Sequence, residues 1–148
     1  RLAFRPPGWK WQLGKVLQRI APHITLPAGL DPKGISRDPR EVSAYQEDPL
    51  IHDRVSPAYS FPVIEAGEWA LANASKLTVP TLILHGTSDP IIDPEGSRLF
   101  DQKAPGTTLF EIEGGYHELH HDLDRDRYFK AIDKWLSTTF PFGSSAGM

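Results

Sequence analysis

Two short apolar segments in the second half of the chain constrain its fold more than any other feature. Residues 79–85 (VPTLILH) and 107–112 (TTLFEI) are rich in β-branched and aliphatic side chains. Such runs are typical of strands that are buried on both faces of a parallel sheet. Between them, the Asp-Pro-Glu sequence at 93–95 predicts a helix that ends near Ala104, because Asp suits the N-cap and Pro the first helical position.

The order of the expected elements indicates one class of fold. After the second strand, Tyr128, Ile132, Trp135 and Leu136 recur at helical spacing and predict a closing helix. A strand, helix, strand, helix order implies an α/β protein with a βαβα unit, a parallel sheet and a right-handed crossover. Two strands do not form a stable open sheet alone, so we expect another segment to pair with their free edges.

The first half of the chain has a different character, because short helical patterns alternate with prolines. Apolar residues recur at helical spacing over 9–20, and the sequence DPRE at 38–41 combines an Asp N-cap with Pro at the start of a short second helix. A longer helix is expected from near Pro57 or Pro62 to Ala74. No segment in this half alternates polar and apolar residues over a useful length.

Composition excludes several classes of protein. No apolar run approaches the ~18 residues needed to cross a bilayer, and no charged start with an apolar region resembles a signal peptide. The chain has no Cys, which excludes disulfide scaffolds and suits a reducing compartment, so a cytoplasmic location is expected. A net charge of −3 gives no basic surface for nucleic acid. The start at Arg1 rather than Met suits a partial product.

Polar residues follow both expected strands, at the edge of a parallel sheet where ligands bind. Asp89 lies in HGTSDP after the first strand, and His117 lies in GGYHE after the second. A carboxylate that accepts the Nδ1 proton of an imidazole leaves Nε2 to act as a general base toward a serine. Asp89 and His117 are therefore the candidate acid and base. Asp89 could instead be an Asx-turn residue before Pro90, and Asp93 is a second candidate acid whose position better suits an N-cap.

The same segments resemble the last third of monoacylglycerol lipases and, more broadly, the lysophospholipase branch of the α/β-hydrolase fold. The resemblance rests on LTVPTLILHGTSD (77–89), DPEGS (93–97) and EGGYHE (113–118). It extends to the first half through QEDPL (46–50) and AGEWA (66–70), which resemble the helical cap of those enzymes.

The resemblance implies a partial α/β-hydrolase fold, with a helical cap or lid over 1–76 and the C-terminal part of the core over 77–142. The small and polar residues of 143–148 predict a flexible tail. The implied activity is serine-dependent hydrolysis of a carboxylic ester, such as a monoacylglycerol or another single-chain lipid ester. Asp89 would be the triad acid and His117 the general base. The resemblance implies no metal or organic cofactor.

The chain departs from this family in one respect, because it contains no G-x-S-x-G nucleophile motif. Ser36 and Ser88 lie in partial matches that both lack the final glycine, and we interpret both as coincidence. The serine is therefore expected on a missing N-terminal half of the hydrolase core, in the same or a second chain. Alone, this chain is expected to be inactive; a non-catalytic fragment or binding module is an alternative.

Other features have competing interpretations. The sequence HELHH at 117–121 matches the H-E-x-x-H signature of zinc hydrolases, although no glutamate follows Glu118 to supply the usual downstream ligand. The charged run 122–127 is expected to be the solvated start of a helix. Four aromatic residues of the first half could line an acyl-chain tunnel but more often form packing core: Trp9, Trp11, Phe61 and Trp69.

Overall fold

The structure is a computed structural model that describes residue 3 and residues 7–141, so the tail expected over 143–148 lies outside the described residues. In chain order, its helices are α1 (Gly8–Ile20), α2 (Pro39–Glu47), α3 (Pro57–Asn73), α4 (Pro94–Lys103) and α5 (Arg125–Thr139). Its strands are β1 (Leu26–Pro27), β2 (Arg54–Val55), β3 (Thr81–Gly86) and β4 (Thr107–Ile112). Short 3₁₀ helices occupy Pro32–Gly34, Ala74–Lys76 and Leu119–His121.

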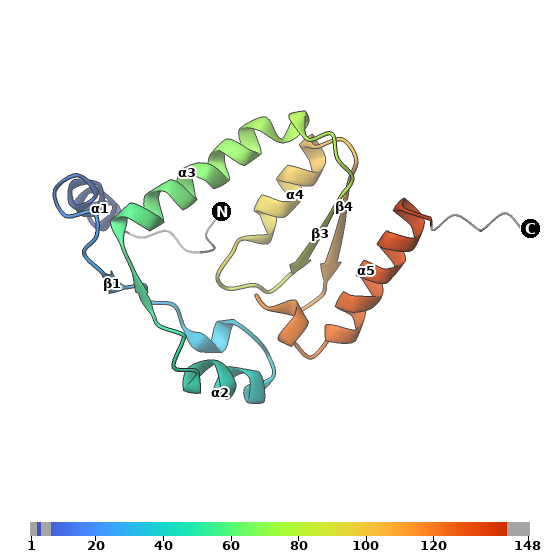
Figure 1. Cartoon of the computed structure of the whole chain (residues 1–148), viewed down its shortest axis with the longest axis horizontal. Coiled ribbons are helices and arrows are strands. Elements are labelled where there is room, and N and C mark those ends of the chain that lie inside the picture. The colour runs from blue at the N-terminus through green and yellow to red at the C-terminus, as the bar shows by residue number, and fades with distance from the viewer. Residues whose placement is uncertain (1–2, 4–6, 142–148) are drawn as a thin grey trace, which may run out of the picture.

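The βαβα unit expected for the second half is present. Strands β3 and β4 are parallel, with a register that runs from Thr81 opposite Thr107 to Gly86 opposite Ile112. Helices α4 and α5 pack on opposite faces of this two-stranded sheet (Figure 1). The carboxyl ends of β3 and β4 therefore lie at the same end of the sheet. This places the loops that follow the two strands side by side.

Helices α2 and α4 begin as the sequence predicts. Asp38 accepts a hydrogen bond from the N–H of Arg40 at 2.9 Å, and Asp93 accepts one from Glu95 at 3.0 Å. Each aspartate is followed by a proline at the first helical position. These bonds satisfy backbone donors that have no partner within the helix.

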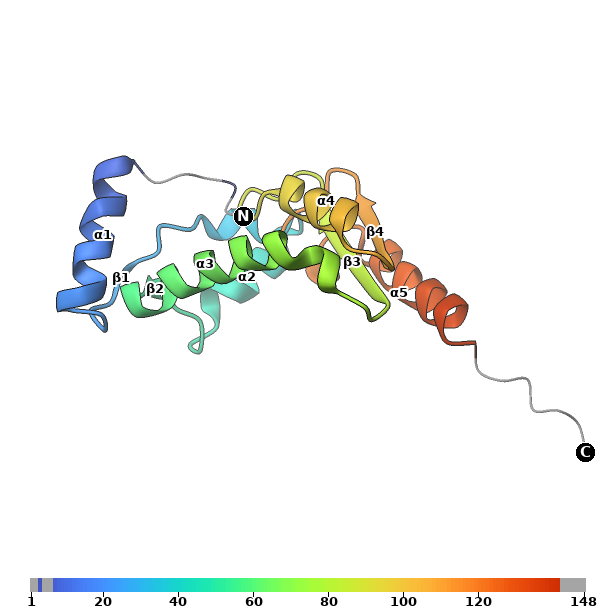
Figure 2. The ribbon, with the colours of Figure 1, turned by 90° about the horizontal axis from the view of Figure 1, so that it is seen from above.

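The first half of the chain is mainly helical, and α3 connects it to the second half. Figures 1 and 2 show α3 running from α1 at one end of the molecule to α4. Helix α3 begins at Pro57 and includes Pro62 in its interior. The antiparallel pair β1–β2 was not predicted, because two residues per strand are too few to show an alternating pattern.

The sheet is less covered than its sequence predicts. Residues Thr81 to His85 are not fully buried, although the apolar run is typical of a strand buried on both faces. The physical reason is that, within the described residues, β3 and β4 pair only with each other. Ile112 at the end of β4 is fully buried.

The four aromatic side chains of the first half divide into two groups. Trp11 and Phe61 stack edge to face with their ring centroids 4.9 Å apart, and Phe61 is buried, so this pair joins α1 to α3. Trp9 and Trp69 are largely exposed. None of the helices in the described part of the chain has both the length and the apolar character to cross a membrane.

Candidate active site

Backbone hydrogen bonds join the loop after β3 to the loop after β4. The N–H of Thr87 donates to the carbonyl of Ile112 at 3.0 Å, and the N–H of Ser88 donates to Gly115 at 3.1 Å. The Thr87 hydroxyl in turn accepts the N–H of Gly114 at 2.8 Å. Gly114 has a φ of +69°, in the left-handed region that favours glycine. The two loops therefore form one fixed unit.

Gly86 allows this unit to form. A Cβ atom at this position would collide with backbone atoms of Gly115 and Tyr116. Only glycine lets the end of β3 approach the second loop so closely. The distance between the residues that follow, Asp89 and His117, depends on this approach.

Asp89 and His117 meet across the two loops. Nδ1 of His117 lies 2.9 Å from Oδ2 of Asp89, within the hydrogen-bond distance that the sequence hypothesis requires. The Asp89 side chain is 3% exposed and the His117 side chain 37% exposed. The carboxylate is thus buried behind an imidazole that reaches solvent. An Nδ1–H bond to Asp89 leaves Nε2 as the atom that can accept a proton.

Asp89 also forms the turn that the sequence offered as its alternative role. Its Oδ1 accepts N–H groups of Ile91 at 2.8 Å and Ile92 at 3.0 Å. One carboxylate oxygen therefore organises the loop while the other binds His117, so the two interpretations do not exclude each other. Burial raises the pKa of Asp89, but hydrogen bonds from His117, His85 and the two backbone groups outweigh it and hold the pKa well below its usual value.

The surroundings of His117 raise its pKa. The hydrogen bond to Asp89 raises the pKa of His117, and the charges of Asp89 and Glu118 add to this effect. Partial burial lowers the pKa but does not cancel these contributions. These interactions therefore stabilise an imidazolium at His117 beside the Asp89 carboxylate.

The other candidate residues have environments of their own. Asp93 caps α4 and binds the N–H of Glu95, as its sequence position suggested. Ser36 is buried, and its hydroxyl donates to the carbonyl of His121 at 2.7 Å. Ser88 is exposed.

Beside the site, a buried carboxylate forms an ion pair that the sequence pattern does not predict. Asp122 was expected at the solvated start of a helix, but it is only 2% exposed. Its carboxylate binds the Nε of Arg37 at 2.9 Å and accepts backbone N–H groups of Arg37, Tyr116 and Leu123, each at 2.9 Å. The expectation for Asp122 was wrong because its partner, Arg37, is distant in sequence.

The HELHH segment does not form the zinc-hydrolase arrangement. That arrangement needs its two histidines one turn apart on an α-helix, whereas residues 119–121 form a single 3₁₀ turn. His117 is bonded to Asp89, and His121 Nδ1 lies 3.0 Å from Glu118 Oε2. Glu118, His120 and His121 do bring potential ligand atoms within 4.8 Å of one another, but His117 is not part of this group.

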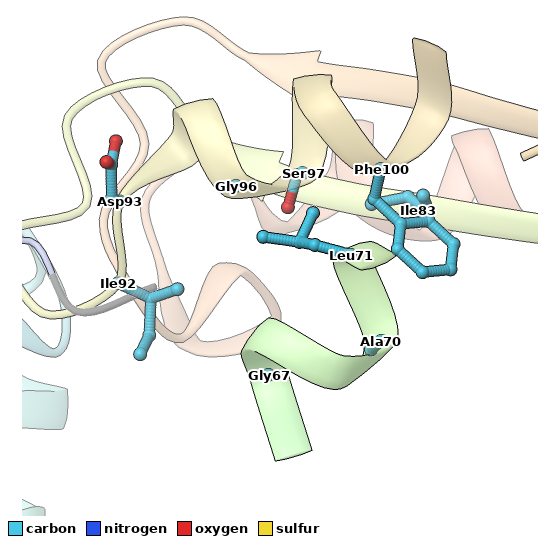
Figure 3. Close-up of a pocket in the computed structure, with 9 residues that line it drawn as sticks. All are labelled: Gly67, Ala70, Leu71, Ile83, Ile92, Asp93, Gly96, Ser97 and Phe100. Atoms are coloured by element: carbon cyan, nitrogen blue, oxygen red, sulfur yellow. The ribbon is translucent and has the colours of Figure 1, made fainter. Parts of the chain in front are cut away.

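An apolar cavity of about 250 Å³ lies behind the acid loop, between α3, β3 and α4. Figure 3 shows Leu71 of α3 beside Ile83 of β3 and Phe100 of α4. Ser97 and Ile92 also line the cavity, whereas Asp89 and His117 do not. The cavity is therefore separate from the Asp89–His117 pair.

Comparisons with known proteins identify the family. A profile of the Hydrolase_4 family, described as serine aminopeptidase, S33, matches residues 1–124. The chain belongs to this family. It is 33% identical over 127 residues to the monoacylglycerol lipase of Mycolicibacterium smegmatis, a match that covers 84% of the chain and 45% of the relative.

Two further relatives agree with this match. Human monoglyceride lipase is 33% identical over 128 residues, which cover 83% of the chain and 42% of the relative. The crystal structure of the Paleococcus ferrophilus monoacylglycerol lipase matches with a TM-score of 0.83 and 40% identity, over 90% of this chain and 53% of that one. The expected partial α/β-hydrolase fold is thereby confirmed. The chain spans less than half the length of the two curated lipases.

Proposed function

We propose that Asp89 and His117 supply the acid and base of a Ser-His-Asp triad in a hydrolase of single-chain lipid esters. The observation that carries the proposal is the 2.9 Å bond between His117 Nδ1 and the buried Asp89 carboxylate. The nucleophilic serine is proposed to lie outside the 148 residues, on an N-terminal half of the core that pairs with the free edge of the sheet.

Each residue has a defined role in this reaction. Nε2 of His117 accepts the serine proton as the hydroxyl oxygen attacks the ester carbonyl, and then returns that proton to the leaving alcohol. Asp89 remains ionised, orients the ring through Nδ1 and stabilises the imidazolium. The same Nε2 then deprotonates the water that attacks the acyl-enzyme and passes this proton to the serine oxygen as the fatty acid leaves.

Two substrate classes are supported to different degrees. Relatives named monoacylglycerol lipases favour an ester with one acyl chain and a glycerol leaving group. The family description, serine aminopeptidase, favours an amide substrate as a second candidate. Both reactions use the same triad, so the leaving group and not the acid–base pair distinguishes them.

The test expresses residues 1–148 together with the segment encoded directly upstream. We expect the product to react with a fluorophosphonate probe and to hydrolyse monooleoylglycerol much faster than trioleoylglycerol or an aminoacyl 4-nitroanilide. His117→Ala should abolish hydrolysis of every substrate, while His23→Ala, at an exposed histidine distant in sequence from the triad, serves as the control.

Three results would contradict the proposal. The first is an upstream segment that encodes no serine on a strand-to-helix turn. The second is full activity of His117→Ala. Preferential cleavage of the anilide would retain the triad but replace the lipid ester with a peptide as the substrate.

A further inference from the structure

A second histidine, His85, contacts the same carboxylate oxygen of Asp89 as His117 does. His85 lies near the carboxyl end of β3, and its side chain is 11% exposed. Its Nε2 lies 3.3 Å from Oδ2 of Asp89 and 3.2 Å from the carbonyl oxygen of Ile92. Its Nδ1 lies 2.6 Å from the hydroxyl of Ser97 in α4. The ring thus joins the strand, the acid loop and the helix.

The neighbours of His85 determine where its proton lies. A carboxylate and a backbone carbonyl only accept hydrogen bonds, so Nε2 must carry a hydrogen that is shared between Asp89 and Ile92. Nδ1 is then unprotonated in the neutral ring, and the Ser97 hydroxyl donates to it. The result is a directed chain of donors from Ser97 through His85 to Asp89, which also binds His117.

We propose that His85 is a positioning residue for the triad, which orients the Asp89 carboxylate and shares its Oδ2 with His117. The proposal rests on the proposed function, because it assigns a role in the same hydrolytic site. His85 does not touch the substrate; it acts only through Asp89. Ser97 fixes the orientation of the His85 ring.

Two donors on one oxygen have a measurable consequence. Oδ2 distributes its negative charge between His85 and His117, so removal of His85 leaves more charge for the remaining imidazolium. The pKa of His117 should therefore rise when His85 is replaced by an apolar residue. The substitution also removes the His85 contact that holds the Asp89 carboxylate in place. A displaced carboxylate positions His117 less well, which lowers kcat.

Other charged groups near the two rings are already paired. Glu111 lies beside His85 in the strand register, but its carboxylate binds Arg98 at 2.8 Å. Asp93 caps the helix that carries Ser97. Asp89 and Glu118 are the groups whose charges act on His117. A change in His117 titration on substitution of His85 would therefore be transmitted through Asp89.

The experiment compares three variants in the complete enzyme described under the proposed function. His85→Leu removes both ring nitrogens, His85→Gln retains an N–H donor that can reach Asp89, and Ser97→Ala removes only the hydroxyl at Nδ1. His23→Leu, at an exposed histidine, is the control. The readouts are kcat and KM as a function of pH, the pKa of His117 from NMR titration, and thermal stability.

We expect His85→Leu to lower kcat about 10- to 100-fold with little change in KM, the size of loss that a displaced catalytic group causes. The pKa of His117, and the acidic limb of the rate profile with it, should move to higher pH. His85→Gln should restore most of the kcat and most of the original His117 pKa. Ser97→Ala should change both in the same direction as His85→Leu, but by less.

Unchanged kcat and His117 titration in His85→Leu would overturn the inference. So would a loss of activity that follows thermal stability alone, with no shift of the acidic limb and no rescue by Gln, because that is the signature of simple packing. The NMR titration needs no turnover. A protein without esterase activity in which His85→Leu still raises the His117 pKa would therefore overturn the proposed function and leave the His85–Asp89 coupling in place.

Discussion

Asp122 holds Arg37 at 2.9 Å and so connects the first half of the chain to the loop that carries His117. The same carboxylate accepts the N–H of Tyr116, the residue directly before His117. Two further bonds reinforce this connection: Ser36 donates to the carbonyl of His121, and the N–H of Glu118 donates to the carbonyl of Ile35. The base of the predicted cap and the imidazole loop therefore form one polar unit.

Removal of the Asp122 carboxylate should destabilise this unit. Asp122→Ala leaves the Arg37 Nε and three backbone N–H groups without their acceptor, while Arg37 keeps its ion pair with Asp124 at 2.8 Å. A buried donor left unsatisfied costs about 1–3 kcal/mol. We expect urea denaturation of the complete enzyme to show this loss. Arg40→Ala removes an ion pair with Asp38 in which the arginine side chain is 85% exposed, and it should change stability little. Equal losses in the two variants would contradict the role of Asp122.

Asp89 and Asp93 should respond differently to the same substitution. Asp89→Asn is expected to lower kcat about 10⁴-fold, because an amide can hold His117 in the wrong tautomer and does not stabilise the imidazolium. Asp93→Asn retains an oxygen that can cap α4, so its kcat should remain close to that of the unaltered enzyme. Steady-state hydrolysis of a soluble ester measures both. If Asp93→Asn proved the more damaging change, the assignment of the triad acid would be wrong.

The pH dependence of hydrolysis should report the raised pKa of His117. The ring must be neutral to accept the serine proton, and its hydrogen bond to Asp89 raises its pKa from the ordinary value of 6.5. The acidic limb of kcat/KM is therefore expected at a pH above 6.5. With Asp89→Asn the cause of the shift is removed, and the residual activity should have its limb at lower pH. A limb at or below 6.5 in the unaltered enzyme would contradict this electrostatic account.

Local patterns predicted most of the elements and the contact between Asp89 and His117. Capping at Asp38 and Asp93 is determined by neighbouring residues, so it can be recognised without the fold. The meeting of Asp89 and His117 follows from the parallel order of two strands and from the resemblance to a known family. Each of these signals lies within a short stretch of sequence.

Contacts between distant segments could not be predicted in the same way. Arg37 and Asp122 are separated by 85 residues, and neither carries a local signal that names its partner. His85 lay in the recognised segment, but its contact with Asp89 depends on how the acid loop folds back over the strand end. Within the described residues, strands β3 and β4 pair only with each other, so the burial inferred from the apolar run exceeded what the structure shows.

Treatment with a metal chelator distinguishes hydrolysis by a serine triad from hydrolysis that depends on zinc. Because His117 is bonded to Asp89 and not arranged with His121 on a helix, we expect EDTA or 1,10-phenanthroline to leave ester hydrolysis unchanged. His121→Ala should likewise retain activity. Loss of hydrolysis on chelation, restored by Zn²⁺ and mirrored by His121→Ala, would favour a metal-dependent reaction over the serine triad.

Residues 1–148 expressed alone should neither react with a fluorophosphonate nor remain a monomer. An acid and a base without an activated serine cannot form an acyl-enzyme, and Ser36 is buried with its hydroxyl bonded to the carbonyl of His121. Strands β3 and β4 pair only with each other within the described residues, so their outer edges are open to a second copy of the chain. Size-exclusion chromatography with light scattering measures the association, and probe labelling measures the nucleophile. A monodisperse monomer that labels would contradict both expectations, and loss of that labelling in Ser88→Ala would then identify the exposed Ser88 as the nucleophile.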